Sequence, residues 1–285
     1  MQRLGFQLQN IIYLCIIYKY ILAIQTTERK AVMTISTFQR YEKKFLITDE
    51  QRKILLPIFL DRMNYDEYCL KNESGKYTIY NIYYDTENSD VIRENANARS
   101  YKEKLRLRSY YPVDSEDDKV FVELKKKENG VGNKRRIKLP FQDAKRLIDD
   151  RTIPVFQEYL PNQVAKEIGE YLRVYRVIPT LYLQYDRIAL FGKENPEFRL
   201  TIDDNIRTRR SDFGFYPRDD DFLLLEPGTH IMEIKFLGSM PMWLSGLLSE
   251  QGLFSRGFSK YGTEYKFRAK QRELHYSYEY EKEGN

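Results

Sequence analysis

The chain has 285 residues, of which 31% are charged, and Lys and Arg exceed Asp and Glu to give a formal net charge of +5. Its two cysteines and two histidines exclude a disulfide scaffold and a Cys/His zinc site, and they argue against a cysteine or serine–histidine nucleophile. A catalytic metal would therefore be held by oxygen, as Mg²⁺ and Mn²⁺ are. The length suits one large domain, and the mild basicity suits an anionic partner.

The first residues of the chain differ in pattern from the rest of the sequence, and we expect residues 1–36 to be an N-terminal extension outside the fold. The apolar stretch from Ile11 to Ile24 is interrupted by Lys19 and is shorter than the about 20 residues of a membrane span. A signal peptide or an anchor is the alternative interpretation of this stretch. We expect the folded domain over 37–273 and a loose tail over 274–285.

Eight segments read as β-strands, several of them because apolar and charged residues alternate. In chain order they are 40–47, 77–85, 102–108, 120–127, 134–139, 180–191, 198–203 and 231–236. The segment 102–108 shows the pattern most clearly, with Leu105 and Leu107 on one face and Lys104, Arg106 and Arg108 on the other. A Gly-Val-Gly-Asn turn before Lys134 predicts a hairpin between the fourth and fifth of these strands.

Five segments are predicted to be helices that cover the outside of the sheet. Thr48 and Gln51 form a capping-box pattern that starts a helix ending near Met63, with a kink expected at Pro57. The others span about 141–149, 162–177, 241–251 and 260–273.

The ionic faces of the strands permit two arrangements. A single face of this kind is more often exposed to water in an open sheet. Because the pattern recurs in at least five strands, we favour an α+β fold in which a closed antiparallel eight-stranded β-barrel has helices packed outside. Its lumen would hold many cations, each costing several kcal/mol unless an anion compensates it. A bound polyphosphate would compensate them.

Seven motifs, taken in order over about 37–271, resemble the VTC domain family of the CYTH-like triphosphate tunnel metalloenzymes. They are Arg40-x-Glu42-x-Lys44, Lys-Leu-Arg-Leu-Arg ending at Arg108, Phe-Val-Glu-Leu-Lys ending at Lys125, Tyr185-Asp186-Arg187, Arg-Leu-Thr-Ile-Asp ending at Asp203, Met-Glu-Ile-Lys ending at Lys235, and Phe-Ser-Lys-Tyr ending at Tyr261. The resemblance implies a tunnel-shaped catalytic domain and a polyphosphate polymerase, which transfers the γ-phosphoryl group of ATP to a growing inorganic polyphosphate chain with Mn²⁺ or Mg²⁺.

The resemblance also implies roles for particular residues. The catalytic phosphate-binding cations would be Lys44, Arg106, Arg108, Lys125, Arg187 and Lys260. Glu233 matches a metal-binding carboxylate, and Glu123 is a second candidate. Tyr185 and Ser259 match flanking substrate contacts, and Lys134 and Arg136 further basic residues of the tunnel. The same strands and their neighbours supply other candidate substrate contacts: Glu42, Lys104, Lys127, Arg199, Arg207 and Lys235.

Two other functions are compatible with these residues: a tripolyphosphatase or nucleoside triphosphatase with the same tunnel, and a non-catalytic polyanion-binding module. Arg40 stands where the related triphosphatases have the first Glu of a Glu-x-Glu-x-Lys motif, which favours a tunnel that retains long polyanions. Nucleic acid is not an expected partner, because no DNA- or RNA-binding motif is present. We expect a cytoplasmic protein, with a separate membrane partner needed for any export of the product, and the oligomeric state is left open.

Overall fold

The structure is a computed structural model that describes residues 40–97, 101–129 and 131–283, with side chains as far as residue 271. The predicted extension over 1–36 and the apolar stretch Ile11 to Ile24 lie outside the described residues. No helix within the described ranges is both long and apolar enough to span a membrane.

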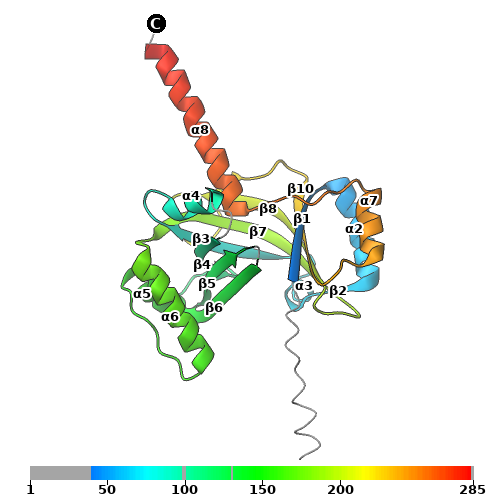
Figure 1. The fold of residues 1–285 in the computed structure, drawn as a ribbon, viewed down its shortest axis with the longest axis horizontal. Coiled ribbons are helices and arrows are strands. Elements are labelled where there is room, and N and C mark those ends of the chain that lie inside the picture. Colours follow the sequence, from blue (N-terminus) through cyan, green and yellow to red (C-terminus); the bar gives the residue numbers. More distant parts are fainter. Residues whose placement is uncertain (1–39, 98–100, 130, 284–285) are drawn as a thin grey trace, which may run out of the picture. The chain divides into compact units, whose positions relative to one another are not determined.

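The domain is built on one antiparallel sheet of ten strands, which confirms the predicted α+β class (Figure 1). Eight strands follow the order β1-β10-β8-β7-β3-β4-β5-β6, and two short ones join it, β2 beside β7 and β9 beside β8. The strands are β1 (Arg40–Thr48), β2 (Met63–Tyr65), β3 (Tyr77–Asp85), β4 (Tyr101–Ser109), β5 (Lys119–Glu128), β6 (Val131–Pro140), β7 (Ile178–Gly192), β8 (Arg199–Arg209), β9 (Phe222–Leu223) and β10 (Thr229–Leu237).

The predicted closure of the barrel is not confirmed. The strand order ends at β1 and at β6, and within the described ranges no ladder joins these two strands. The segment that precedes α8 (Lys260–Glu283) lies along the free edge of β1 instead, because the Arg256 N–H donates to the Lys44 carbonyl at 2.8 Å. Lys104 of β4 donates to Ser259 Oγ of the same segment at 2.9 Å. This segment therefore contacts both β1, at one edge of the sheet, and β4, in the other half of the sheet.

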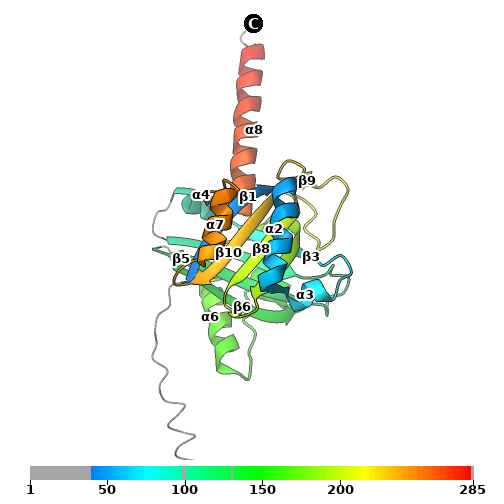
Figure 2. The same cartoon turned by 90° about the vertical axis from the view of Figure 1, so that its right-hand side faces the viewer.

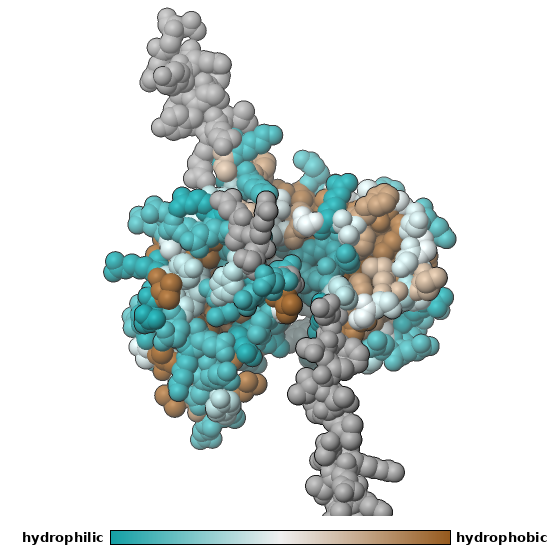
Figure 3. Space-filling model, in the orientation of Figure 1, coloured by the Kyte–Doolittle hydropathy of each residue, from teal (hydrophilic) through white to brown (hydrophobic). Residues whose placement is uncertain are grey.

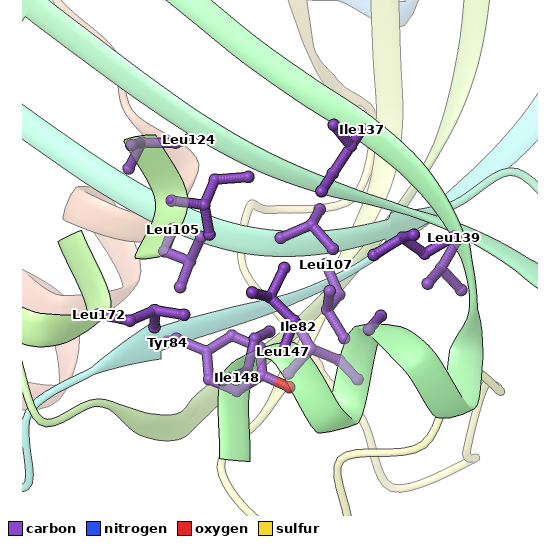
Figure 4. Packing of buried hydrophobic residues seen from close by; sticks show 14 of the residues in the cluster. Ile82, Tyr84, Leu105, Leu107, Leu124, Ile137, Leu139, Leu147, Ile148 and Leu172 are labelled. Atoms are coloured by element: carbon purple, nitrogen blue, oxygen red, sulfur yellow. The ribbon is translucent and has the colours of Figure 1, made fainter. Parts of the chain in front are cut away.

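Helices cover the outer faces of both halves of the sheet, as predicted (Figures 1 and 2). Around β1, β8 and β10, α2 (Asp49–Arg62) and α7 (Met242–Glu250) enclose one core. Around β3, β4, β5 and β6, α5 (Phe141–Asp149) and α6 (Tyr159–Val174) enclose another. Figure 4 shows Leu147 and Ile148 of α5 beside Ile82 of β3. Figure 3 shows apolar side chains still exposed over α2 and α7.

Local sequence accounts for these elements. The capping box of α2 is present, since Thr48 Oγ1 accepts from the Gln51 N–H at 3.2 Å and Gln51 Oε1 accepts from the Thr48 N–H at 3.0 Å. Leu105 and Leu107 are completely buried in the core under α5 and α6. Full burial stabilises such side chains by about 1.5–3 kcal/mol each, which fixes the face that β4 turns away from the helices.

The opposite face of the sheet, here called the inner face, carries a third apolar cluster. It includes Ile79, Tyr83 and Leu181, and it is joined by Ile92 of α4 (Asp90–Asn97) and Tyr261 of α8. The inner face is therefore ionic in one region and apolar in another, whereas the alternation of the sequence predicts an almost wholly ionic one.

Two other features differ from the predictions. The last helix is longer than predicted, because α8 continues to Glu283. No Pro or Gly interrupts the sequence between Gly262 and Gly284, so nothing ends the helix near Glu273. Periodicity also does not predict the one-turn helix α3 (Glu67–Leu70) or the strands β2 and β9, because they are too short to show a repeat.

Candidate active site

Charged residues from seven strands and one helix converge on the inner face. Alternation along β1, β4, β5, β6, β7, β8 and β10 turns one residue in two toward this face, while the residues between them enter the outer cores. We call the converging set the charged cluster. It contains Glu42, Lys44, Lys104, Arg106, Arg108, Glu123, Lys125, Lys134, Arg187, Asp203, Glu233, Lys235 and Lys260.

Glu123 of β5 anchors the arginines of β4. Its Oε2 accepts from Arg106 Nε at 2.8 Å and from Arg106 Nη2 at 2.7 Å, and Arg108 Nε lies 3.7 Å away. The carboxylate is completely buried, and its Oε1 accepts no hydrogen bond from the described residues and lies 3.7 Å from the Lys134 ammonium. Burial alone would raise the pKa of Glu123, but the surrounding cations hold it far below its usual value. Glu123 is thus a counter-ion here, and its role as a metal ligand stays a prediction.

Asp203 of β8 is the counter-ion of Arg187 and Lys260, although it was not among the predicted site residues. Arg187 donates to its two oxygens at 2.6 and 2.8 Å, and Lys260 Nζ donates to Oδ2 at 2.5 Å. Only 1% of Asp203 is exposed. Burial would raise the pKa of this carboxyl, yet the two cations keep it lowered. Its position at the end of the Arg-Leu-Thr-Ile-Asp motif was the signal that could have identified it.

Tyr185 links three of the predicted cations. Its hydroxyl accepts from Arg108 Nη2 at 3.1 Å, and its ring lies 5.1 Å from the Arg187 guanidinium and 4.3 Å from the Lys260 ammonium. Tyr83, which the sequence did not single out, accepts from Arg106 Nη1 at 3.0 Å. Aromatic rings and hydroxyls therefore hold these cations where their charges would otherwise repel one another.

Glu42 and Glu233 lie on neighbouring strands and share two lysines. Lys44 Nζ is 3.0 Å from Glu42 Oε1 and 3.4 Å from Glu233 Oε2, and Lys235 contacts both carboxylates. Burial raises the pKa of Glu42, as does the nearby Glu233, but the lysines leave it lowered. The pKa of Glu233 is likewise lowered by Lys235, Lys44 and Arg187 against the effect of burial.

The Glu42 and Glu233 pair fits a magnesium or manganese ion. Its donors are oxygens only, and Mg²⁺ is commonly held by one or two carboxylates together with substrate phosphates. In the part of the chain that the structure describes, no group of three or more His, Cys, Asp or Glu side chains could hold a metal by itself. A metal at Glu233 would therefore need further oxygen ligands from the substrate or from water.

The two halves of the sheet face each other across this cluster. Burial lowers the pKa of Lys125 of β5, while Glu42 of β1 raises it and Lys44 of β1 lowers it, so the charges of these two strands interact. These strands stand at nearly opposite ends of the strand order. Lys44 also donates to the Phe258 carbonyl at 3.0 Å, next to Ser259 and Lys260. The inner face is therefore concave around the charged cluster, although the sheet is not closed.

The structure does not bring four of the predicted residues into the charged cluster. Arg199 is exposed and pairs with Glu197, Lys127 is exposed near the end of β5, and Arg136 lies over the Phe121 ring. Arg207 donates to Asn205 and to the Asp221 carbonyl. Their roles in substrate binding stay predictions.

A β-bulge explains why Arg207 is separated from Asp203. The register between β7 and β8 shifts between Gln184 and Asp186, and Asn205 has a positive φ of 47°. The additional residue inverts the alternation, since Ile202 enters the outer core whereas Ile206 enters the inner cluster. Arg207 consequently lies on the other face.

Phosphate binding is expected to weaken as pH rises from 7 to 9. Burial and the neighbouring cations lower the pKa of Lys104 to about 8 against the effect of Tyr83, and the cations lower that of Tyr83 to about 8 against the effect of its burial. Above pH 8, Lys104 loses a positive charge and Tyr83 gains a negative one, while phosphate stays ionised. Calorimetric titration with inorganic tripolyphosphate should show falling affinity and proton uptake on binding. Lys104→Arg should make the affinity depend less on pH. A wild-type affinity independent of pH would contradict the titration of Lys104 and Tyr83 in this range.

Comparisons with known proteins place the chain in a family. Residues 39–268 match the VTC domain family. No curated protein sequence is significantly similar to the chain. Among solved structures, the chain is similar to a candidate adenylate cyclase from Bacillus halodurans, with 14% identity, a TM-score of 0.44, and coverage of 76% of this chain and 92% of that one. It is also similar to a candidate adenylyl cyclase from Hippeastrum described as having a dominant triphosphatase activity, with 15% identity, a TM-score of 0.44, and coverage of 78% and 93%.

Proposed function

Because the chain belongs to the VTC domain family, we propose that it is a metal-dependent polyphosphate polymerase, which transfers the γ-phosphoryl group of ATP to a growing inorganic polyphosphate chain. Membership supports this activity, and the charged cluster supplies groups suited to it. The observation that carries the proposal is the excess of cations on the concave inner face.

The charged cluster contains more cations than carboxylates. Glu123 and Asp203 neutralise part of the charge of the arginines, but Lys104 and Lys125 have no carboxylate within ion-pair distance in the described part of the chain. The lowered pKa of Lys104 reflects first its burial and also its like-charged neighbours. An extended polyanion would satisfy these cations at regular intervals, whereas a single small anion would satisfy only a few.

The residue types suit phosphoryl transfer, whose catalysis consists mainly of positioning and electrostatic stabilisation. The planar forks of Arg106, Arg108 and Arg187 can bind two phosphate oxygens each, and lysine ammonium groups can follow the moving charge. Glu233 and Glu42 would hold the metal ion, which when bound supplies charge stabilisation on the phosphate oxygens. The attacking chain end is already ionised near neutral pH, so no general base is needed.

Incubation with ATP and Mn²⁺ followed by gel electrophoresis tests the proposal. The wild-type protein should produce a ladder of long phosphate chains. Lys44→Ala should abolish the ladder, because Lys44 joins both carboxylates and the segment before α8. Lys43→Ala is the matched control, since this neighbour is exposed on the same strand and should leave the ladder unchanged.

The same assay separates the alternatives. Release of orthophosphate without a ladder would replace the polymerase by a tripolyphosphatase or nucleoside triphosphatase. Polyphosphate binding without metal-dependent turnover would instead indicate a binding module.

A further inference from the structure

Four half-buried aromatic side chains form a group on the inner side of the sheet that phosphate binding does not use. We call Tyr68, Tyr77, Tyr110 and Phe121 the aromatic rim. Tyr110 is its centre, with ring centroids 4.8 Å from Tyr68, 6.1 Å from Tyr77 and 5.7 Å from Phe121. The four side chains are each only partly exposed. They come from α3, β3, the end of β4 and β5, so the fold has brought together rings that lie far apart in the sequence.

The aromatic rim adjoins two arginines of the charged cluster. Phe121 is the register partner of Arg108, and Tyr77 is the register partner of Arg187. Directly opposed residues of an antiparallel pair lie about 5 Å apart. A group that stacks on these rings could therefore stay covalently attached to a phosphate held by Arg108 or Arg187.

Cations also approach the rings of the aromatic rim. The Arg136 guanidinium lies 4.7 Å from the centroid of the Phe121 ring, and the Lys71 ammonium lies 5.5 Å from that of Tyr68. Partly exposed rings combined with cations are the composition with which proteins bind nucleotides without reading their sequence, because each base has a face that stacks and each phosphate is an anion.

The aromatic rim lies away from the base of α8. Tyr77 begins β3, whereas Asp85 ends it and accepts from the Tyr261 hydroxyl of α8 at 2.7 Å. Nine residues of strand span roughly 27 Å. Figures 1 and 2 both show α3 on the opposite side of the sheet from α8.

We propose that the aromatic rim is the subsite for the nucleobase of the nucleoside triphosphate. This inference rests on the proposed use of ATP and adds a direction to it. The base stacks at the aromatic rim, the phosphate nearest the ribose is held by Arg108 and Arg187, and the terminal phosphate points toward Lys44 and Glu233. The donor nucleotide then enters from the α3 side of the sheet.

Tyr110→Ala tests the subsite, with Tyr110→Phe as the matched control that keeps the ring. The ligands are the β,γ-imido analogue of ATP, which is not turned over, and inorganic tripolyphosphate, which has no base. Tyr110→Ala should weaken binding of the nucleotide about tenfold and leave binding of tripolyphosphate unchanged. Tyr110→Phe should retain both affinities. Unchanged tripolyphosphate binding also shows that the variant is folded.

A fluorescent base gives a second readout. The fluorescence of 2-aminopurine riboside triphosphate should be quenched when it binds to the wild-type protein or to Tyr110→Phe. Binding to Tyr110→Ala should quench it much less. An equal loss of affinity for the nucleotide and for tripolyphosphate in Tyr110→Ala would overturn the proposal. Equal affinity of the wild-type protein for the two ligands would also overturn it. A missing ladder in the gel assay would contradict the polymerase activity but not the nucleobase subsite, because the protein could still bind the nucleotide more tightly than tripolyphosphate.

Discussion

Arg106→Ala is expected to reduce polymer synthesis about 100-fold or more, because it removes a guanidinium aimed at the charge of the transferring group. The same change should destabilise the fold by about 3 kcal/mol, since Glu123 would remain completely buried without its two hydrogen bonds from Arg106. Gel analysis of the products and urea unfolding measure the two effects separately.

The double variant Arg106→Ala/Glu123→Gln distinguishes the site from the fold. Replacing the carboxylate by an amide removes the unpaired buried charge, so stability should return toward the wild-type value while synthesis stays abolished. Wild-type turnover in either variant would count against the assignment of Arg106. Recovered synthesis in the double variant would show that Arg106 serves only to neutralise Glu123.

Asp203→Asn is expected to separate turnover from binding. Loss of the carboxylate releases Arg187 and Lys260 from their shared partner, so the geometry of two phosphate-binding cations is lost. We expect turnover to fall about 100-fold. Affinity for tripolyphosphate should be maintained or increased, because a negative charge has left the charged cluster. Steady-state kinetics and calorimetric titration measure these two quantities.

Asp204→Asn is the matched control for Asp203. The neighbouring aspartate lies on the outer side, where it contacts Arg52 of α2 and Lys76. Turnover and affinity should both stay near wild type. If Asp203→Asn weakened binding and turnover equally, Asp203 would support the fold of the site without positioning its cations for the reaction.

The predicted strands and cores agree closely with the structure where alternation is long and regular. In β4, complete burial of Leu105 and Leu107 leaves Arg106 and Arg108 only the inner face. Five of the six predicted phosphate-binding cations lie together for this reason, whereas Lys260 begins α8. Inward positions of β5 and β10 also supply Glu123 and Glu233. Alternation could not indicate Tyr83 or Tyr110, because a tyrosine in a strand reads equally well as part of a core.

Other site features depend on events that a periodic pattern does not encode. One additional residue at Asn205 moves Arg207 to the other face, and a bulge leaves no regular signal in the sequence. The gap between β1 and β6 is equally invisible, because strand pairing at the end of a sheet depends on twist and on competition from other segments. Here Arg256 bonds to the edge of β1.

In the regular strands, the sequence by itself determined which residues face inward, since a strand side chain has only two directions and the apolar partners must be buried. It also indicated phosphate binding, because the inward positions of these strands carry more arginine and lysine than carboxylates, and the chain has only two His and two Cys. Only the tertiary structure decided which carboxylate holds which cation, that Asp203 joins Arg187 to Lys260, and that four aromatic rings meet beside Arg108. Those contacts join strands and helices that are distant in the chain, and local periodicity carries no information about such pairings.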